Sequence, residues 1–180
     1  RPGVKHVPIL ALARPEDRVI QVVAISKSFN CAGIKSASAL IFNPRLRGQV
    51  DAVLPPTFLS PFALEAQIAA YSDAGAAWLD QLNAYVDENI RQVRAFFATH
   101  LPQVRVSDPE GTYLLWLDFR DTGLSDAEIH RRIYDEAHVY LNDGLMHDPD
   151  QGEGFQRMTT ASPRSLVLEA CRRIARVINQ

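Results

Sequence analysis

Hydrophobic and polar positions along the chain switch between strand-like and helix-like spacing. Residues 18–24 (RVIQVVA) form a β-branched apolar run, which is typical of a strand buried on both faces. Residues 35–42 (KSASALIF) predict a second strand, which ends at Asn43-Pro44. The polar turn SKSFNCAGI lies between these two strands.

Two helices are expected next. Ser60-Pro61 combines an N-cap side chain with a proline at the first helical position, and the Ala-rich segment behind it runs to about Tyr71. After an interruption at Gly75, a long amphipathic helix is predicted that stops at Leu101-Pro102. Its apolar positions recur at nearly helical spacing: Trp78, Leu82, Tyr85, Val86, Val93, Phe96 and Phe97.

The rest of the chain predicts a small α/β unit. Short strands are expected at residues 104–106, 112–119, 139–141 and 155–159. Ser125 and Glu128 have the spacing of a capping box at the start of a helix. Ser162-Pro163 begins a last helix, whose apolar face includes Val167, Ala170, Cys171, Ile174, Val177 and Ile178.

Composition narrows the class of protein. The 180 residues are 47% hydrophobic and 22% charged, with a formal net charge of −2, so disorder is excluded as the main state. Without a basic block, we expect neither a nucleic-acid nor a membrane partner. Two cysteines, Cys31 and Cys171, are too few for a disulfide framework, which indicates a reducing, cytoplasmic compartment.

Two residues could carry chemistry. Lys27 directly follows the first predicted strand, where partial desolvation would make its amine available as a nucleophile, although a turn lysine is more often simply solvated. Arg157, in GFQRM, could bind a carboxylate through two parallel hydrogen bonds, or it could be a surface arginine at a strand end. The five histidines lack metal-ligand spacing, so we expect no metal site.

Several segments resemble pyridoxal-phosphate enzymes of the aspartate aminotransferase fold, and within it the cystathionine β-lyase or C–S lyase branch of the class I/II aminotransferases. The matching stretches are SKSFNCAGIKSA, EGTYLLWLDFR, NDG and GEGFQRMTTASPRS. Their order and spacing are similar to the C-terminal half of that family over essentially the whole chain. The chain starts at Arg1 without an initiator Met, so we expect it to be part of a longer protein.

The resemblance implies an α/β fold, the C-terminal part of the type I pyridoxal-phosphate transferase fold. Residues 1–74 would be the end of the large domain with a remnant of its sheet, residues 75–100 a long interdomain helix, and residues 101–180 the small α/β domain. The missing half would supply the aspartate at the pyridine nitrogen, the aromatic residue that stacks on the ring and most of the phosphate site.

The resemblance also implies roles for individual residues. Lys27 matches the lysine that links covalently to pyridoxal phosphate, and Arg157 matches the arginine that binds the substrate α-carboxylate. Lys35 and Ser26 would contact the phosphate, or else be a solvated lysine and a turn cap. Gly33 is expected to serve backbone geometry. The sequence departs from the family pattern at Ala24, in LMHDPDQGEGF and in MTTAS, which leaves the phosphate contacts and the substrate choice open.

The implied function is a pyridoxal-phosphate enzyme acting on an amino-acid substrate, as a homodimer, by C–S β-elimination or by transamination. The branch resemblance slightly favours β-elimination. The alternatives are an aminotransferase-like regulatory or ligand-sensing module and a catalytically incomplete fragment.

Overall fold

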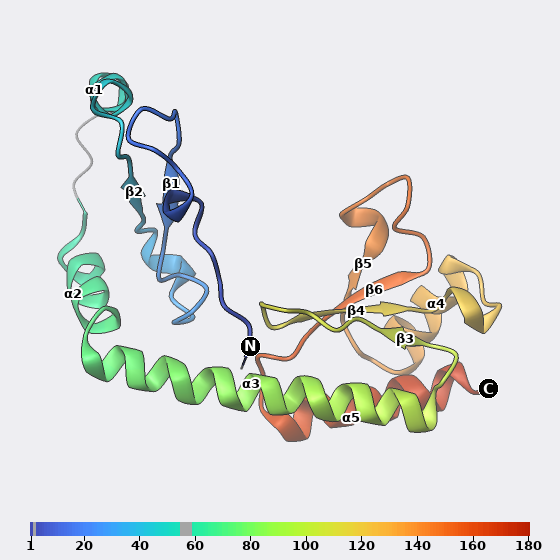
Figure 1. The fold of residues 1–180 in the computed structure, drawn as a ribbon. Helices are drawn as coiled ribbons and strands as arrows, with labels where there is room; N and C mark the ends of the chain where they lie inside the picture. Colours follow the sequence, from blue (N-terminus) through green and yellow to red (C-terminus); the bar gives the residue numbers. More distant parts are fainter. Residues whose placement is uncertain (2, 55–58) are drawn as a thin grey trace. The chain divides into compact units, whose positions relative to one another are not determined.

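The computed structural model describes residue 1, residues 3–54 and residues 59–180, and it divides into two compact units (Figure 1). The N-terminal unit is Lys5–Leu82, and the C-terminal unit joins Asn83–Gln180 to Arg1–Val4. The division falls inside helix α3 (Asp73–His100), the long helix that the apolar spacing predicts. None of the helices in the described ranges is both long and apolar enough to cross a membrane.

The N-terminal unit contains one antiparallel strand pair. Strand β1 (Gln21–Val23) pairs with β2 (Ser38–Leu40), with Gln21 opposite Leu40. The expectation of a strand buried on both faces is wrong for this unit, because the Val22 side chain on β1 is 66% exposed. Within the described residues, β1 has β2 as its single strand neighbour.

Side-chain caps begin the two helices that follow. Ser60 Oγ accepts a hydrogen bond from Ala63 N at 3.2 Å, which confirms the predicted start of α2 (Pro61–Ala70). Helix α1 (Pro44–Val53) was not predicted, although Asn43 Oδ1 caps it by accepting from Leu46 N at 3.0 Å. Gly75 lies in the first turn of α3, where a Cβ would overlap the carbonyl oxygens of Ala69 and Ala70.

The C-terminal unit is built on a four-stranded antiparallel sheet in the order β3-β4-β6-β5 (Figure 1). These strands are β3 (Arg105–Val106), β4 (Leu114–Asp118), β6 (Phe155–Thr159) and β5 (Asn142–Asp143). The predicted strand at residues 139–141 is wrong. Val139 N donates to Ile133 O at 3.0 Å and so ends the preceding helical segment, and the pairing with β6 begins only at Asn142.

Helices cover one face of this sheet. Leu115, Leu117 and Met158 point to the buried face. Helix α4 (Asp126–Arg131) is capped by Ser125 Oγ, which accepts from Glu128 N at 3.3 Å, and it continues into a π-helical turn, Arg132–Glu136. The last helix, α5 (Arg164–Ile178), buries most of its predicted apolar face.

Helices α3 and α5 run parallel and side by side, because hydrogen bonds join them at both ends. Arg164 Nε donates to Asn89 Oδ1 at 2.9 Å at one end, and Asn179 Nδ2 donates to His100 O at 3.2 Å at the other. Figure 1 shows both helices along the same side of the sheet. Arg157 belongs to the opposite face of the sheet, which these helices leave open.

Candidate functional site

Lys27 lies in a tight turn, residues 26–30, directly behind β1. Phe29 N donates to Ile25 O at 2.9 Å, and Cys31 N donates to Ser26 O at 3.0 Å. The Phe29 ring stacks on Trp78 with 5.4 Å between ring centroids. These contacts fix the backbone that carries the lysine.

The Lys27 side chain is exposed, and its Nζ makes no hydrogen bond or ion pair within the described parts of the chain. The expected desolvation is therefore wrong for this unit, because no described element covers the turn. A primary amine that no carboxylate engages is available to a carbonyl compound. Its catalytic role remains a prediction.

Ser26 and Lys35 belong to the same β1–β2 connection as Lys27. Ser26 is half-buried, and Lys35 is exposed at the end of the 3₁₀ turn Ala32–Ile34. The expectation for Gly33 is wrong, because its φ is not left-handed and its Cβ position is open. Asn30 and Lys35 take the left-handed conformation instead, each with φ 52°. The contacts of Ser26 and Lys35 with a phosphate remain predictions.

Arg157 occupies the middle of β6, on the open face of the sheet. It stands directly opposite Trp116 on β4 and Asn142 on β5. Its Nη2 donates to Asn142 Oδ1 at 3.0 Å. Its Nε is buried and, within the described residues, has no hydrogen-bond partner. No carboxylate in those residues pairs with it, so its charge is uncompensated within the unit.

Two other arginines of this unit, Arg105 and Arg120, are paired with a carboxylate. Asp118 accepts from Arg120 Nε at 2.8 Å and from Arg105 Nη2 at 3.1 Å. The hydrogen bonds from the Arg120 side chain, the largest favourable contribution, lower the pKa of the Asp118 carboxyl to about 2. Arg157 therefore differs from its neighbours in keeping its charge available.

The NDG segment forms strand β5, which pairs with β6 and so places Asn142 opposite Arg157. Asp143 lies beside Asn142 but faces the other way, with His130 Nδ1 2.9 Å from its Oδ2 and Gln156 Nε2 donating to its Oδ1. The amino-acid sequence alone indicates neither of these contacts. NDG alone is typical of a turn, and only the strand register brings Asn142 to Arg157.

The long segment between β5 and β6 forms a loop with a narrow base. A Cβ at Gly144 or at Gly152 would overlap the backbone of the other, so the two glycines allow this close approach. His147 in the loop packs edge-on against Trp116, with 5.6 Å between ring centroids. The loop therefore reaches the aromatic neighbour of Arg157.

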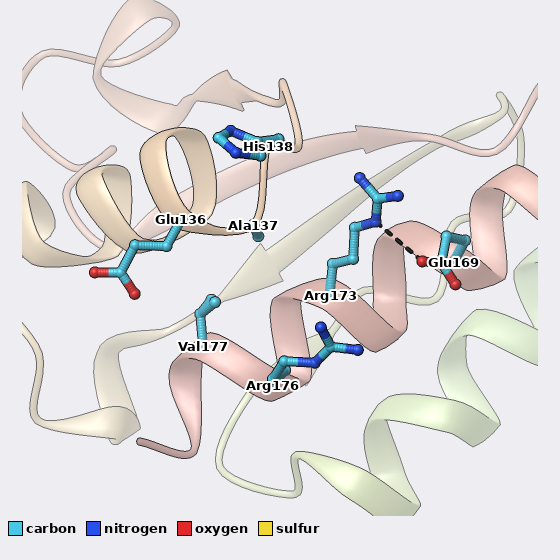
Figure 2. A pocket seen from close by; sticks show the side chains of 7 residues that line it. All are labelled: Glu136, Ala137, His138, Glu169, Arg173, Arg176 and Val177. Carbon is cyan, nitrogen blue, oxygen red and sulfur yellow. Dashed lines mark hydrogen bonds and ion pairs between the residues drawn. The ribbon is translucent and has the colours of Figure 1, made fainter.

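A pocket of about 230 Å³ opens elsewhere on the C-terminal unit (Figure 2). It is lined by Glu136, Ala137, His138, Glu169, Arg173, Arg176 and Val177. Arg173 Nε donates to Glu169 Oε1 at 3.0 Å. Two arginines and two glutamates cancel in formal charge, and neither Lys27 nor Arg157 lines the pocket, so it is not the candidate site.

Neither metal chemistry nor thiol chemistry is indicated by the described residues. No three His, Cys, Asp or Glu side chains there gather into a metal-binding group. Cys171 is fully buried, and burial raises the pKa of its thiol to about 12, which confirms it as packing. Cys31 is half-buried, with its Sγ 3.5 Å from Ile25 O.

Known proteins are similar to this chain in sequence and in fold. The profile of the family Aminotransferase class I and II matches residues 2–174. The chain is 39% identical over 177 residues to cystathionine beta-lyase PatB of Bacillus subtilis, covering 96% of this chain and 45% of PatB. It is 30% identical over 168 residues to protein MalY of Escherichia coli, covering 89% of this chain and 41% of MalY.

A solved structure of a related enzyme is similar to this chain over a similar share of its length. The crystal structure of cystalysin from Treponema denticola, which contains a pyridoxal 5′-phosphate cofactor, has a TM-score of 0.89 at 28% identity. The match covers 99% of this chain and 46% of cystalysin. The chain therefore spans less than half the length of these relatives.

Proposed function

The chain belongs to the aminotransferase class I and II family, and we propose that it is the C-terminal part of a pyridoxal-phosphate enzyme that acts on amino acids. The proposed reaction is C–S β-elimination, which converts a cysteine S-conjugate such as cystathionine, together with one water, into pyruvate, ammonia and a thiol. The observation that carries this proposal is the 39% identity to a cystathionine beta-lyase over 96% of the chain.

The residues present fit pyridoxal phosphate. Lys27 offers an exposed amine that no described carboxylate engages, on a turn held by Phe29 and Trp78. Ser26 and Lys35, in the same connection, supply a hydroxyl and an ammonium for the phosphate. When bound, the cofactor stabilises negative charge at the α-carbon of the substrate.

Lys27 and Arg157 would have separate roles in the reaction. Arg157 binds the α-carboxylate through parallel charge-assisted hydrogen bonds, which orients the α-carbon and selects α-amino acids over simple amines. Lys27 would hold the cofactor through Nζ. The same Nζ, once free, would accept the α-proton of the substrate, and the C–S bond would break as the thiolate leaves.

Transamination is the second candidate, because the family whose profile matches the chain is that of the class I and II aminotransferases. Both reactions begin with the same proton transfer to Lys27 and differ only after that transfer. A ligand-sensing module is less favoured, because Lys27 and Arg157 are both retained. We further propose that the complete enzyme is a homodimer, as the family resemblance implies, and that it is cytoplasmic, as the low cysteine content indicates.

The test uses the complete protein loaded with pyridoxal phosphate. Addition of cystathionine is expected to change the visible absorbance of the cofactor and to release pyruvate, which lactate dehydrogenase and NADH detect. A Lys27→Ala variant is the control. Amino-group transfer to an added 2-oxo acid without pyruvate release would favour transamination, and an unchanged spectrum would contradict both reactions.

A further inference from the structure

We propose that Asn142 is a positioning residue that orients Arg157 for an end-on, two-point contact with the substrate carboxylate. The proposal rests on the proposed function, in which Arg157 binds that carboxylate. It adds a residue of the NDG segment to the substrate site.

The strand register places the two side chains together. Asn142 and Arg157 are directly opposite on β5 and β6, and directly opposite residues project from the same face of a sheet. Arg157 Nη2 donates one of its two hydrogens to Asn142 Oδ1 at 3.0 Å. The second hydrogen of Nη2 and both hydrogens of Nη1 remain available to a ligand.

The buried Nε determines which edge of the guanidinium is presented. A carboxylate can engage Nε with one terminal nitrogen, or it can engage both terminal nitrogens end-on. Nε of Arg157 is buried and without a partner among the described residues, so a ligand cannot reach the first edge. Asn142 holds the guanidinium in this rotation, so that less side-chain freedom is lost when the substrate binds.

The neutrality of Asn142 matters as much as its position. Asp118 pairs with both Arg105 and Arg120, whereas the amide of Asn142 leaves the charge of Arg157 uncompensated. The charged neighbour, Asp143, is directed to the other face by His130 and Gln156. These two contacts also hold the two-residue strand β5, and hence Asn142, against β6.

The experiment measures equilibrium binding to the complete, cofactor-loaded protein. Two ligands without an α-proton are compared through the cofactor absorbance: α-aminoisobutyrate, and tert-butylamine, in which a methyl group replaces the carboxylate. Asn142→Ala is expected to raise the Kd of α-aminoisobutyrate about tenfold, the loss of one hydrogen bond to a charged group, and to leave that of tert-butylamine unchanged. Asn142→Asp is expected to raise it at least as much, because its carboxylate would neutralise Arg157.

The variants separate this proposal from the proposed function. Asn142 is exposed, so its replacement removes no buried packing, and the exposed Asn179→Ala is the matched control. If Arg157→Ala weakens only α-aminoisobutyrate while Asn142→Ala changes neither ligand, the role of Asn142 is overturned and the proposed function stands. If Arg157→Ala affects both ligands equally, the carboxylate binds elsewhere, and the roles of both Arg157 and Asn142 are overturned, whereas an absence of pyruvate release from cystathionine would overturn the proposed function.

Discussion

Arg157 Nη2 and Asn142 Oδ1 lie 3.0 Å apart across the β5–β6 pair, and this contact gives the arginine a neutral partner. Arg105 and Arg120 in the same unit instead form ion pairs with Asp118. A guanidinium that faces an amide retains its charge for a ligand, whereas one that faces a carboxylate does not. The sheet thus sets Arg157 apart from these two arginines.

Replacement of Lys27 tests the proposed site of covalent attachment. In the complete protein, Lys27→Ala is expected to abolish turnover and leave the fold intact, because the cofactor anchor and the base are lost together. The fall in kcat should exceed the ~10²–10⁴-fold effect of losing a proton-transfer group alone. Lys5→Ala is the matched control, and activity within tenfold of the wild type would remove Lys27 from the mechanism.

Covalent labelling provides an independent check that Lys27 is the lysine that attaches the cofactor. The chain has three lysines: Lys5, Lys27 and Lys35. Borohydride reduction of the cofactor-loaded protein, followed by peptide mass spectrometry, is expected to place the cofactor mass on the peptide that contains Lys27. Labelling of Lys5, Lys35 or a lysine elsewhere in the complete protein, without labelling of Lys27, would contradict the assignment.

Replacement of Arg157 tests the carboxylate contact. Arg157→Lys is expected to raise KM for an amino-acid substrate by about tenfold or more, because an ammonium cannot reproduce the two-point geometry. The affinity for pyridoxal phosphate should change much less. Arg105→Lys, at a largely exposed arginine of the same sheet, controls for a general loss of guanidinium contacts. An unchanged KM would show that the carboxylate binds elsewhere.

The elements with local signals were predictable from the sequence. Ser60-Pro61 and the Ser125–Glu128 pair each mark a helix start that the structure confirms, because a capping hydrogen bond spans only three residues. Asn43-Pro44 carries the same kind of signal for α1, but the sequence pattern indicates only the end of a strand there. The apolar spacing also predicts α3, whose periodicity extends over many turns.

Contacts set by strand register were not predictable. The position of β5 depends on which residue meets Gln156 and Arg157. The apolar run at residues 139–141 is misleading, because Val139 N donates to Ile133 O and the strand pairing begins only at Asn142. Asn142 could be recognised as a neighbour of Arg157 only once the register was known. Desolvation of Lys27 likewise depends on elements that cover it and not on the strand before it.

Asn89 is expected to be the most sensitive polar position of the C-terminal unit. It is fully buried, and its Nδ2 donates to Thr160 O at 2.8 Å and to Ser162 O at 3.0 Å, which secures the turn behind β6. Asn89→Ala is expected to lower the free energy of unfolding by about 2–3 kcal/mol, because two carbonyl groups lose their donor. Denaturant titration measures this, with the exposed Asn83→Ala on the same helix as control.

Asp118 is expected to give the C-terminal unit a stability that depends on acid pH. Its pKa is lowered to about 2 in the folded state, so the stabilisation is complete at neutral pH and is lost as the pH falls from the ordinary value of 3.8 towards 2. Asp118→Asn is expected to cost about 1 kcal/mol at pH 7, because both arginine partners are largely exposed, and progressively less as the pH falls through about 2. Asp121→Asn, which removes an exposed pair, is the control.

Unfolding of the C-terminal unit can be followed selectively in these two experiments. The chain has two tryptophans, Trp78 in the N-terminal unit and Trp116 on β4. In a Trp78→Phe background, fluorescence reports Trp116 alone. A difference between Asp118→Asn and the wild type that does not vary with pH would contradict the assigned role of the carboxylate.

The 180-residue chain by itself is expected not to bind pyridoxal phosphate tightly. It spans 45% of PatB, and its assigned cofactor contacts are confined to Lys27, Ser26 and Lys35 on one connection. An adduct between an amine and a carbonyl compound hydrolyses readily in water unless a preorganised pocket protects it, and the exposed Lys27 has no such cover among the described residues of the N-terminal unit.

The N-terminal unit also exposes large apolar side chains, with Phe62 82%, Val53 78% and Val22 66% exposed, so the chain is expected to self-associate. Titration with the cofactor should therefore give weak, non-saturating absorbance changes, and light scattering should detect oligomers. Tight stoichiometric binding with turnover of an amino acid would show that this half of the family fold is sufficient for cofactor binding and catalysis. We expect the opposite, because the assigned cofactor contacts are all confined to a single exposed connection.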